Sequence, residues 1–251
     1  MKAALVGIYT LWLRDITRFL RDRPRIISSA AQPLLWLFVL GMGLSTAFVR
    51  GGDPAYLRFI YPGIISMSIL FTSVFSAVTI IWDREFGFLK EVLVAPIPRW
   101  SVAIGKAFGG STVAVIQGTI VLLVAPVLGL KFTLLQLLGA FAIMFIVAFS
   151  MTSLGIFIAA KMSTHEGFQV VVNFLLLPIF FLSGAMFPIN GQLPSWMQVL
   201  VRIDPLSYGV DALRQVMVGI QIFPLWLDLG IVFFFGALML AIGAWYFERS
   251  E

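Results

Sequence analysis

The chain has 251 residues, of which 60% are hydrophobic and only 12% are charged. Several charge-free runs reach about 20 residues, which is the length a helix needs to cross a bilayer, so an all-α integral membrane protein is predicted. The composition excludes a soluble domain of typical size and, because cysteine is absent, disulfides and thiol chemistry; the surplus of basic residues needs no nucleic acid to explain it.

Residues 1–25 combine a run of arginines with apolar residues that recur at helical spacing from Leu5 to Leu20. The polar side of this predicted helix carries Arg14, Asp15, Arg18 and Arg21. An arginine-rich helix with aromatic residues on its apolar side suits the lipid surface on the cytoplasmic side of a membrane. The alternative is that this segment only extends the first membrane span into water.

Six apolar runs follow, and each is long enough to cross a bilayer, so residues 26–251 are predicted to form one membrane domain. In the first half of the third run, Gly105 and Gly109 form a pair of small residues that allows close approach of another helix. The six spans are expected at 26–49, 58–82, 102–129, 133–160, 168–189 and 225–247.

The distribution of basic residues predicts the orientation. With six spans and the N-terminus inside, 12 of the 17 Lys and Arg residues fall on the inner side and 5 on the outer side. Basic residues concentrate on the cytoplasmic side of membrane proteins. Both termini are therefore expected in the cytoplasm of a multi-pass protein of the cell membrane.

Residues 83–99 form a dense charged interruption between the second and third spans. Leu89, Val92 and Leu93 recur there at helical spacing, and Pro96 and Pro98 end the pattern. This indicates a short amphipathic helix that lies on the membrane or docks into a groove of a partner. A solvated turn with incidental periodicity is the alternative.

The segment before the last span, residues 190–219, predicts two short helices on the outer side. The first covers Trp196 to Ile203. Asp204 and Pro205 are typical of the start of a second helix, and Gly219 is typical of its end. Together they favour a re-entrant or interfacial hairpin, and a simple outer loop is the alternative.

The chain contains no G-x-x-x-x-G-K-[ST] loop, so it is not expected to bind ATP in the P-loop manner. Its one histidine, His165, lies in the short inner turn between the fourth and fifth spans, where a solvated side chain is the simplest interpretation. No histidine lies at membrane depth, which argues against a Ser–His hydrolase. We therefore expect no catalytic residues, no metal site and no cofactor in this chain.

Charges deep within the spans are nearly absent, and the polar residues well inside them are Gln117, Gln169 and Asn173. Carriers driven by ions or protons retain buried charges, so their scarcity argues against that mechanism. The three amides either line a translocation route or form hydrogen bonds between helices. If the protein moves a substrate, the energy must come from elsewhere, and 83–99 is the natural place to receive it.

Two blocks of sequence resemble the membrane permease subunits of ABC-2 type exporters, in particular the branch that includes drug-resistance and nodulation-factor permeases. The first is the stretch from Arg84 to Pro96, where Phe88 and Lys90 depart from the usual Thr and Glu. The second runs from Phe181 through Pro188 to Arg214. The resemblance spans nearly the whole chain.

The resemblance implies a six-span subunit that dimerises, with itself or with a similar permease, and pairs with two separate ATP-binding subunits that hold ATP and magnesium. It implies export of an amphiphilic or hydrophobic, drug- or lipid-like substrate. The implied coupling residues are Arg84, Glu85, Gly87, Leu89, Glu91, Leu93 and Pro96. From their polar or aromatic character and their place in the chain, the candidate path or exit residues are Gln117, Gln169, Asn173, Phe187, Trp196 and Tyr208. Export of a lipid-linked polysaccharide, or a membrane assembly protein that transports nothing, are the alternatives.

Overall fold

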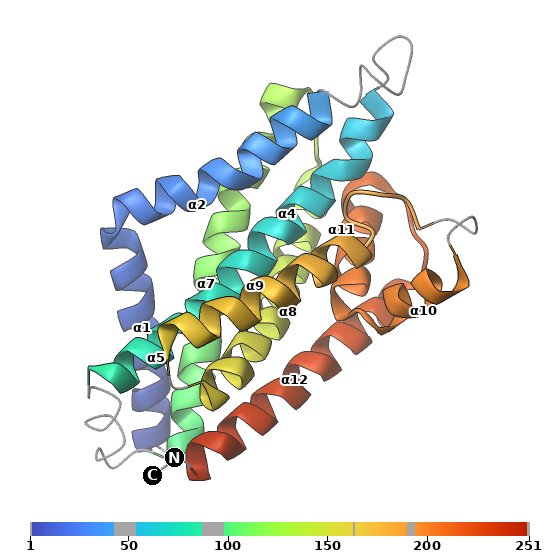
Figure 1. The fold of residues 1–251 in the computed structure, drawn as a ribbon. Helices are drawn as coiled ribbons and strands as arrows, with labels where there is room; N and C mark the ends of the chain where they lie inside the picture. Colours follow the sequence, from blue (N-terminus) through green and yellow to red (C-terminus); the bar gives the residue numbers. More distant parts are fainter. Residues whose placement is uncertain (1, 43–53, 87–97, 163, 190–193, 250–251) are drawn as a thin grey trace.

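The computed structural model describes residues 2–42, 54–86, 98–162, 164–189 and 194–249, and every regular element within them is a helix (Figure 1). Five of these helical segments are long and apolar enough to cross a membrane. They confirm the second to sixth expected spans. Their bounds are Tyr56–Glu85, Arg99–Leu128, Leu134–Lys161, His165–Leu182 and Leu225–Tyr246.

Several spans are built from more than one helical element. The second span joins α4 (Pro54–Ser76) to α5 (Val78–Glu85), and the third joins α7 (Arg99–Leu122) to a short 3-10 helix (Ala125–Leu128). The remaining long helices are α8 (Leu134–Lys161), α9 (His165–Leu182) and α12 (Leu225–Arg249). Helix α8 begins at a capping box in which Thr133 and Gln136 satisfy each other's backbone N–H groups.

The first expected span is described only in part. It consists of α2 (Arg23–Trp36) followed by a π-helical segment (Leu37–Met42). The apolar stretch Ile26–Val39 is too short to rank with the other spans, and residues 43–49 of the expected span lie outside the described residues.

Helix α1 (Lys2–Arg21) packs along the length of α7, and the two helices run in the same direction, because later positions of α1 contact later positions of α7. The glycine pair makes this possible: a Cβ at Gly105 would come 3.0 Å from Cβ of Leu11, and one at Gly109 would come 2.9 Å from a carboxylate oxygen of Asp15. The close approach predicted for the two glycines is confirmed, and the partner helix is α1.

The face of α1 that packs on the protein is not the side that carries most of its large apolar residues. Its buried positions are Ala4, Gly7, Leu11 and Phe19, whereas Leu5, Tyr9, Leu13 and Leu20 of the predicted apolar stripe remain exposed. Small residues allow the close packing, so the large apolar side chains of α1 face away from the protein, as they would toward lipid.

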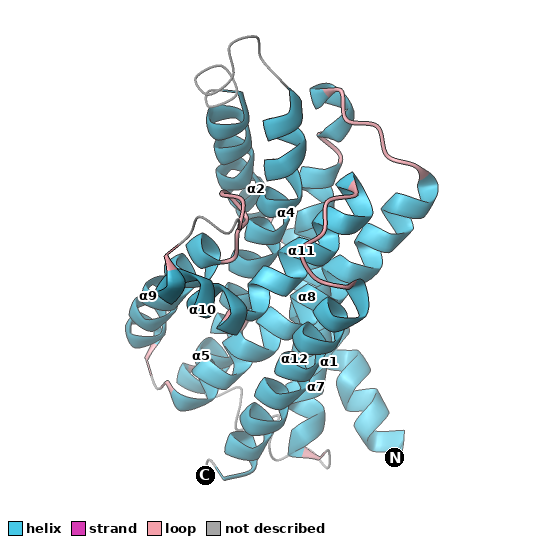
Figure 2. Ribbon diagram, turned by 90° about the vertical axis from the view of Figure 1, so that its right-hand side faces the viewer, coloured by secondary structure: helices cyan, strands magenta, loops and turns pink. Residues whose placement is uncertain are grey.

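The core is centred on α4, which packs against α7, α8 and α11 (Figure 2). Residues 60–70 of α4 are all buried, and the Tyr61 hydroxyl donates to the carbonyls of Val121 and Leu122. Helix α9 is attached more lightly. It buries one stripe of four residues four positions apart, namely Phe168, Val172, Leu176 and Phe180.

The segment before α12 forms α10 (Ser195–Ile203) and α11 (Pro205–Val218). As predicted, the Asp204 side chain accepts from the Leu206 N–H, Pro205 begins α11, and Gly219 ends it in the left-handed conformation with φ of 77°. The two predicted short helices are confirmed, and residues 190–193 lie outside the described residues.

The two ends of the bundle differ in character. We call the end where α5 ends and α7 begins the charged end, and the end that holds α10 and α11 the hairpin end. The start of α1 and the end of α12 also lie at the charged end (Figure 1). This arrangement agrees with an even number of membrane crossings.

Single cysteines in this cysteine-free chain test the orientation. We expect a membrane-impermeant maleimide to label Ser195→Cys in intact cells and to label Glu166→Cys only after permeabilisation, because both positions are exposed and lie at opposite ends of the bundle. Labelling of both cysteines from outside would contradict a cytoplasmic charged end.

Candidate functional site

The last three residues of α5, Asp83, Arg84 and Glu85, each contact a different part of the chain. Successive residues on a helix point about 100° apart, so one short segment can reach three directions. Asp83 contacts α1 and α7, Arg84 contacts the residues after α8, and Glu85 contacts the start of α9. The end of α5 therefore holds the charged end together.

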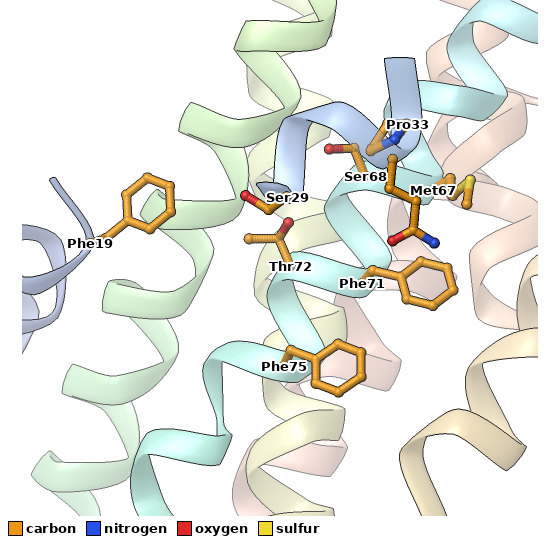
Figure 3. A pocket seen from close by; sticks show the side chains of 9 residues that line it. Phe19, Ser29, Pro33, Met67, Ser68, Phe71, Thr72 and Phe75 are labelled. Carbon is orange, nitrogen blue, oxygen red and sulfur yellow. The ribbon is translucent and has the colours of Figure 1, made fainter. Parts of the chain in front are cut away.

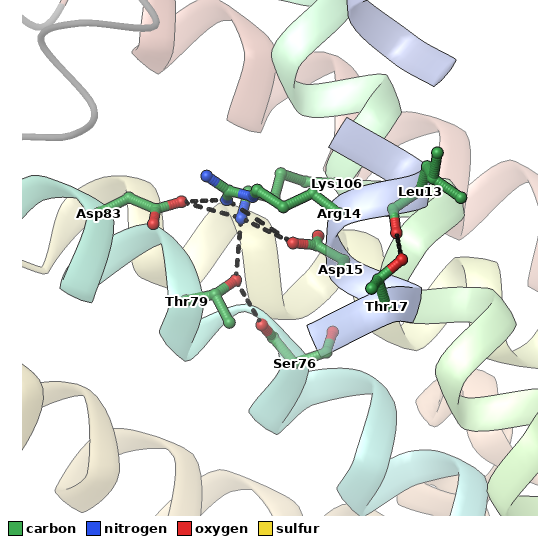
Figure 4. A network of polar contacts seen from close by, with 8 residues as sticks. All are labelled: Leu13, Arg14, Asp15, Thr17, Ser76, Thr79, Asp83 and Lys106. Carbon is green, nitrogen blue, oxygen red and sulfur yellow. Dashed lines mark hydrogen bonds and ion pairs between the residues drawn. The ribbon is translucent and has the colours of Figure 1, made fainter. Parts of the chain in front are cut away.

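Asp83 is the centre of a buried ionic cluster with Arg14, Asp15, Lys106 and Thr79 (Figure 4). One Asp83 oxygen lies 2.6 Å from the Arg14 guanidinium and 2.9 Å from Nζ of Lys106. The Lys106 ammonium also lies 3.3 Å from Asp15 and donates to the Thr79 hydroxyl at 3.1 Å. The cluster therefore joins α1, α5 and α7.

Burial makes these pairings obligatory. The Lys106 side chain is only 4% exposed and the two carboxylate side chains are 11% exposed. Two positive and two negative charges balance, so the cluster has no net charge. Because a buried charge without its partner is costly, and more so near a bilayer, all four groups have to be present for α1 to pack as it does.

Arg84 and Glu85 hold the turn between α8 and α9. The Arg84 guanidinium donates to the Met162 carbonyl at 2.6 Å, and Glu85 accepts from the His165 N–H at 3.2 Å. The same turn contacts α5 through the Trp82 and His165 rings, which are 5.7 Å apart. His165, expected to be simply solvated, is thus part of this contact.

Two of the seven predicted coupling residues, Arg84 and Glu85, are placed by the structure. The others, Gly87, Leu89, Glu91, Leu93 and Pro96, lie outside the described residues. One boundary needs correction: Asp83, Arg84 and Glu85 end the helix of the second span and do not begin a separate one. The span extends further than hydropathy indicates because the charges of Asp83 and Arg84 are paired within the protein.

The three amides predicted for a translocation route do not lie together. Gln117 is buried in α7, where its side-chain oxygen accepts from the Ser29 hydroxyl of α2 at 3.1 Å. Gln169 and Asn173 are exposed on α9, each directly after a residue of its buried stripe. The Ser29 bond is the interhelical hydrogen bond that was one of the two interpretations for Gln117.

The predicted exit residues also separate. Phe187 and Trp196 are exposed, by 54% and 64%. Tyr208 is buried; its hydroxyl donates to the Arg202 carbonyl at 2.8 Å and its ring lies 5.1 Å from that of Phe223. Two of the three aromatic residues are therefore open to a ligand, and the third supports the hairpin from within.

The buried charged groups of the hairpin end include Arg214 and Asp204. The Arg214 guanidinium donates to the Gly184 carbonyl at 2.9 Å and lies 3.9 Å over the Phe59 ring, and burial lowers its pKa to about 10, so it stays charged. Burial raises the pKa of the Asp204 carboxyl to about 7, although the Leu206 N–H and the Ser207 hydroxyl donate to it and oppose that rise.

Sequence reasoning missed the ionic cluster. Asp15 and Lys106 are 91 positions apart, and in the count of basic residues Lys106 is simply one of the 12 on the inner side. A signal was available: Lys106 lies one residue after Gly105 on a small-residue face, and Asp15 interrupts the arginines of the first helix. A lysine that becomes buried when another helix packs closely against its own helix needs a carboxylate from that other helix as a partner.

The spans and the charged end define a multi-pass helical membrane protein. Residues 6–218 match the family model described as ABC-2 type transporter. Because this match covers most of the chain, the protein belongs to the ABC-2 type transporter family. ABC-2 permeases are membrane components that lack an ATPase domain and pair with ATP-binding subunits.

The relatives agree with this assignment. The chain is 34% identical over 200 residues to the transport permease ycf38 of Cyanophora paradoxa, covering 78% of this chain and 69% of that protein. It is 29% identical over 207 residues to nodulation protein J of Rhizobium meliloti, covering 82% and 78%. It is 29% identical over 166 residues to YbhR of Escherichia coli, which is named as a multidrug ABC transporter permease, covering 64% and 44%.

Removing one charge tests the ionic cluster. Lys106→Met leaves Asp15 and Asp83 with Arg14 alone, so we expect the protein to lose about 3–5 kcal/mol of stability. The measurement is the thermal unfolding midpoint of purified protein in detergent, followed by tryptophan fluorescence. Lys161→Met is the control, because Lys161 is exposed and contacts only rings in the described part of the chain. Adding Asp83→Asn to Lys106→Met should recover part of the loss; fully additive losses would show that the two charges do not act as a pair.

The raised pKa of the Asp204 carboxyl predicts that the stability of the protein depends on pH. Its pKa is about 7 in the folded protein and about 3.9 in an unfolded chain, so the folded state binds more protons between these values. The stability that Asp204 contributes is complete below about pH 4 and is lost as the pH rises through 7. We expect unfolding midpoints to fall between pH 5 and pH 8 by the equivalent of about 2–3 kcal/mol. Asp204→Asn keeps the helix cap and should remove that part of the dependence; an unchanged pH profile would contradict the assignment.

Proposed function

We propose that this chain is the permease subunit of an exporter that moves an amphiphilic or hydrophobic, drug- or lipid-like substrate out of the cytoplasm, using ATP hydrolysed by a separate subunit. Membership of the ABC-2 family carries the proposal. The name of YbhR, a multidrug permease, supports an amphiphilic substrate. So does the apolar character of the spans, since a path with few charges suits such substrates better than ions.

Coupling to the ATP-binding subunit is proposed to occur at residues 83–99. The contacts of Asp83, Arg84 and Glu85 support this role, because a displacement of the end of α5 would act on α1, α7 and the α8–α9 turn together. Glu85 itself is exposed, so its carboxylate remains accessible to a partner as well as to His165. In this proposal ATP and magnesium are bound by the partner, which is present in two copies.

A dimer of permeases is part of the proposal, with residues 26–49 as the sixth span of each copy and both termini in the cytoplasm. The exposed face of α9 supports dimerisation. Phe174 is 82% exposed there, and Gln169 and Asn173 on the same helix would be costly to leave in lipid. A second copy against this face would cover the apolar residues and give the two amides a polar route to line.

The hairpin end is the proposed exit. Trp196, Val199, Leu200 and Ile203 form an exposed apolar stripe on α10, and Phe187 is exposed nearby in the chain. Aromatic residues at a membrane interface also serve as anchors, so this stripe either holds the hairpin in the outer leaflet or guides the substrate into it. Tyr208, being buried, contributes to the support of this surface.

The proposal predicts ATP-dependent transport by the complex of this chain with its ATP-binding subunit. In proteoliposomes we expect accumulation of an amphiphilic fluorescent dye that requires ATP. Glu85→Ala should reduce transport at least about tenfold while the unfolding midpoint changes little, because an exposed hydrogen bond contributes only about 0.5–1.5 kcal/mol.

Glu166→Ala is the matched control, since Glu166 is an exposed acid in the first turn of α9 and no coupling role falls on it. Wild-type transport by Glu85→Ala would remove this residue from the coupling contact. A complex that hydrolyses ATP but accumulates no amphiphile, and instead moves a lipid-linked polysaccharide, would contradict the proposed substrate class.

A further inference from the structure

A cavity of about 210 Å³ lies between the end of α1, the middle of α2 and the C-terminal half of α4 (Figure 3). Its wall on α4 is one face of that helix, from Met67 to Phe75, and α1 closes one side with Phe19. The full lining is Phe19, Ser29, Gln32, Pro33, Met67, Ser68, Phe71, Thr72 and Phe75.

The lining combines aromatic and uncharged polar side chains. Three phenylalanines and a methionine provide an apolar surface that adapts to flat groups, and three hydroxyls and one amide provide hydrogen bonds. The lining contains no charged side chain. The cavity therefore suits an uncharged ligand with a ring and a hydroxyl or similar polar group.

Ser68 contributes an unpaired buried hydroxyl to the lining within the described residues. The residue is 1% exposed, and its hydroxyl has no hydrogen-bond partner within the described part of the chain. A buried hydroxyl without a partner costs free energy, and on the wall of a cavity a ligand can satisfy it. Gln32, which also lines the cavity, is exposed, so the cavity is open toward the outside of the bundle.

The volume limits what the cavity holds. A dry cavity of about 150 Å³ binds benzene, and whole drug-sized ligands occupy about 300–1,000 Å³. The present cavity therefore accepts one ring with its substituent, and the rest of a larger molecule would extend into the bilayer through the open side. At the middle of a membrane span, such a ligand arrives from the lipid.

We propose that this α1–α2–α4 cavity binds the ring-bearing, hydroxyl-containing part of an uncharged aromatic amphiphile, and that Ser68 recognises its polar group. The role of this binding as a step in transport rests on the proposed function; in that function the cavity is the site where cargo leaves the bilayer. Binding itself requires neither ATP nor the partner subunit.

A photoaffinity probe tests the site directly. The permease in phosphatidylcholine nanodiscs is irradiated with an uncharged trifluoromethyl aryl diazirine that carries a benzyl alcohol, and the labelled peptides are mapped by mass spectrometry. We expect saturable labelling of residues 67–75 and 29–33. Thr72→Trp, which fills the cavity, should reduce it at least about fivefold, and Leu238→Trp on the exposed side of α12 should not.

Ser68→Ala separates recognition from packing, because it removes only the hydroxyl. We expect the apparent affinity for the alcohol probe to fall roughly two- to tenfold, the usual range for one hydrogen bond, with no change for the analogue that has methyl in place of hydroxymethyl. Equal changes for both probes would overturn the role of Ser68. This comparison stands even if Thr72→Trp does not fold.

Other outcomes overturn the site itself. Labelling that does not saturate, or that persists in Thr72→Trp, would show that the probe only partitions into lipid. If dioleoylglycerol competes with the probe as effectively as unlabelled benzyl alcohol derivatives do, the cavity binds a bilayer lipid. That result would overturn the assignment to aromatic cargo. Saturable labelling of a protein that fails to export would count against the proposed function alone, and absence of labelling in an exporting complex would count against the cavity alone.

Discussion

The charged end of this protein depends on one carboxylate, Asp83, which contacts both Arg14 and Lys106. Lys106 stands inside a membrane span, where a charge is tolerated only with a partner. Asp83 and Asp15 supply that partner from two other helices, and Arg14 restores the balance. Three features of the structure depend on pairing these four charges: the packing of α1 along α7, the length of α5 and the burial of Lys106.

This constraint makes the end of α5 a rigid junction. Asp83, Arg84 and Glu85 each contact a different neighbour, and the Trp82 ring contacts both the Arg18 guanidinium, at 5.1 Å, and the His165 ring. A force applied beyond Glu85 cannot tilt α5 without displacing α1 and the α8–α9 turn, since the buried pairs would otherwise separate at high cost. Motion of several helices as one body is the behaviour expected of such packing.

The features that sequence reasoning predicted well are those set by local rules. Five spans followed from hydropathy, and the hairpin end followed from Asp204, Pro205 and Gly219, whose capping preferences act within a few residues. The protein-facing side of α1 could not be predicted, because amphipathicity alone cannot tell lipid from protein: the small residues and Asp15 pack inward, and most of the large apolar residues face out. For the same reason, the sequence did not reveal that Tyr208 is buried whereas Trp196 is exposed. Whether a polar or aromatic residue faces a neighbour depends on residues distant in sequence, as the pair of Asp15 and Lys106 shows.

Helix α1 connects the two parts of the molecule for which functions are proposed, the charged end and the α1–α2–α4 cavity. Asp15 and Arg14 fix its middle to the ionic cluster, and Phe19, one turn further along, closes the α1–α2–α4 cavity. Phe19 also lines the small space beside Asp15 and Thr79, so the cavity wall and the cluster share a helix and a side chain. Because α1 ends at Arg21 and α2 begins at Arg23, a shift of α1 moves two walls of the cavity relative to α4. Any movement that the charged end undergoes would therefore change the shape of the cavity, and this gives a direct physical route from the end of α5 to a ligand in the membrane.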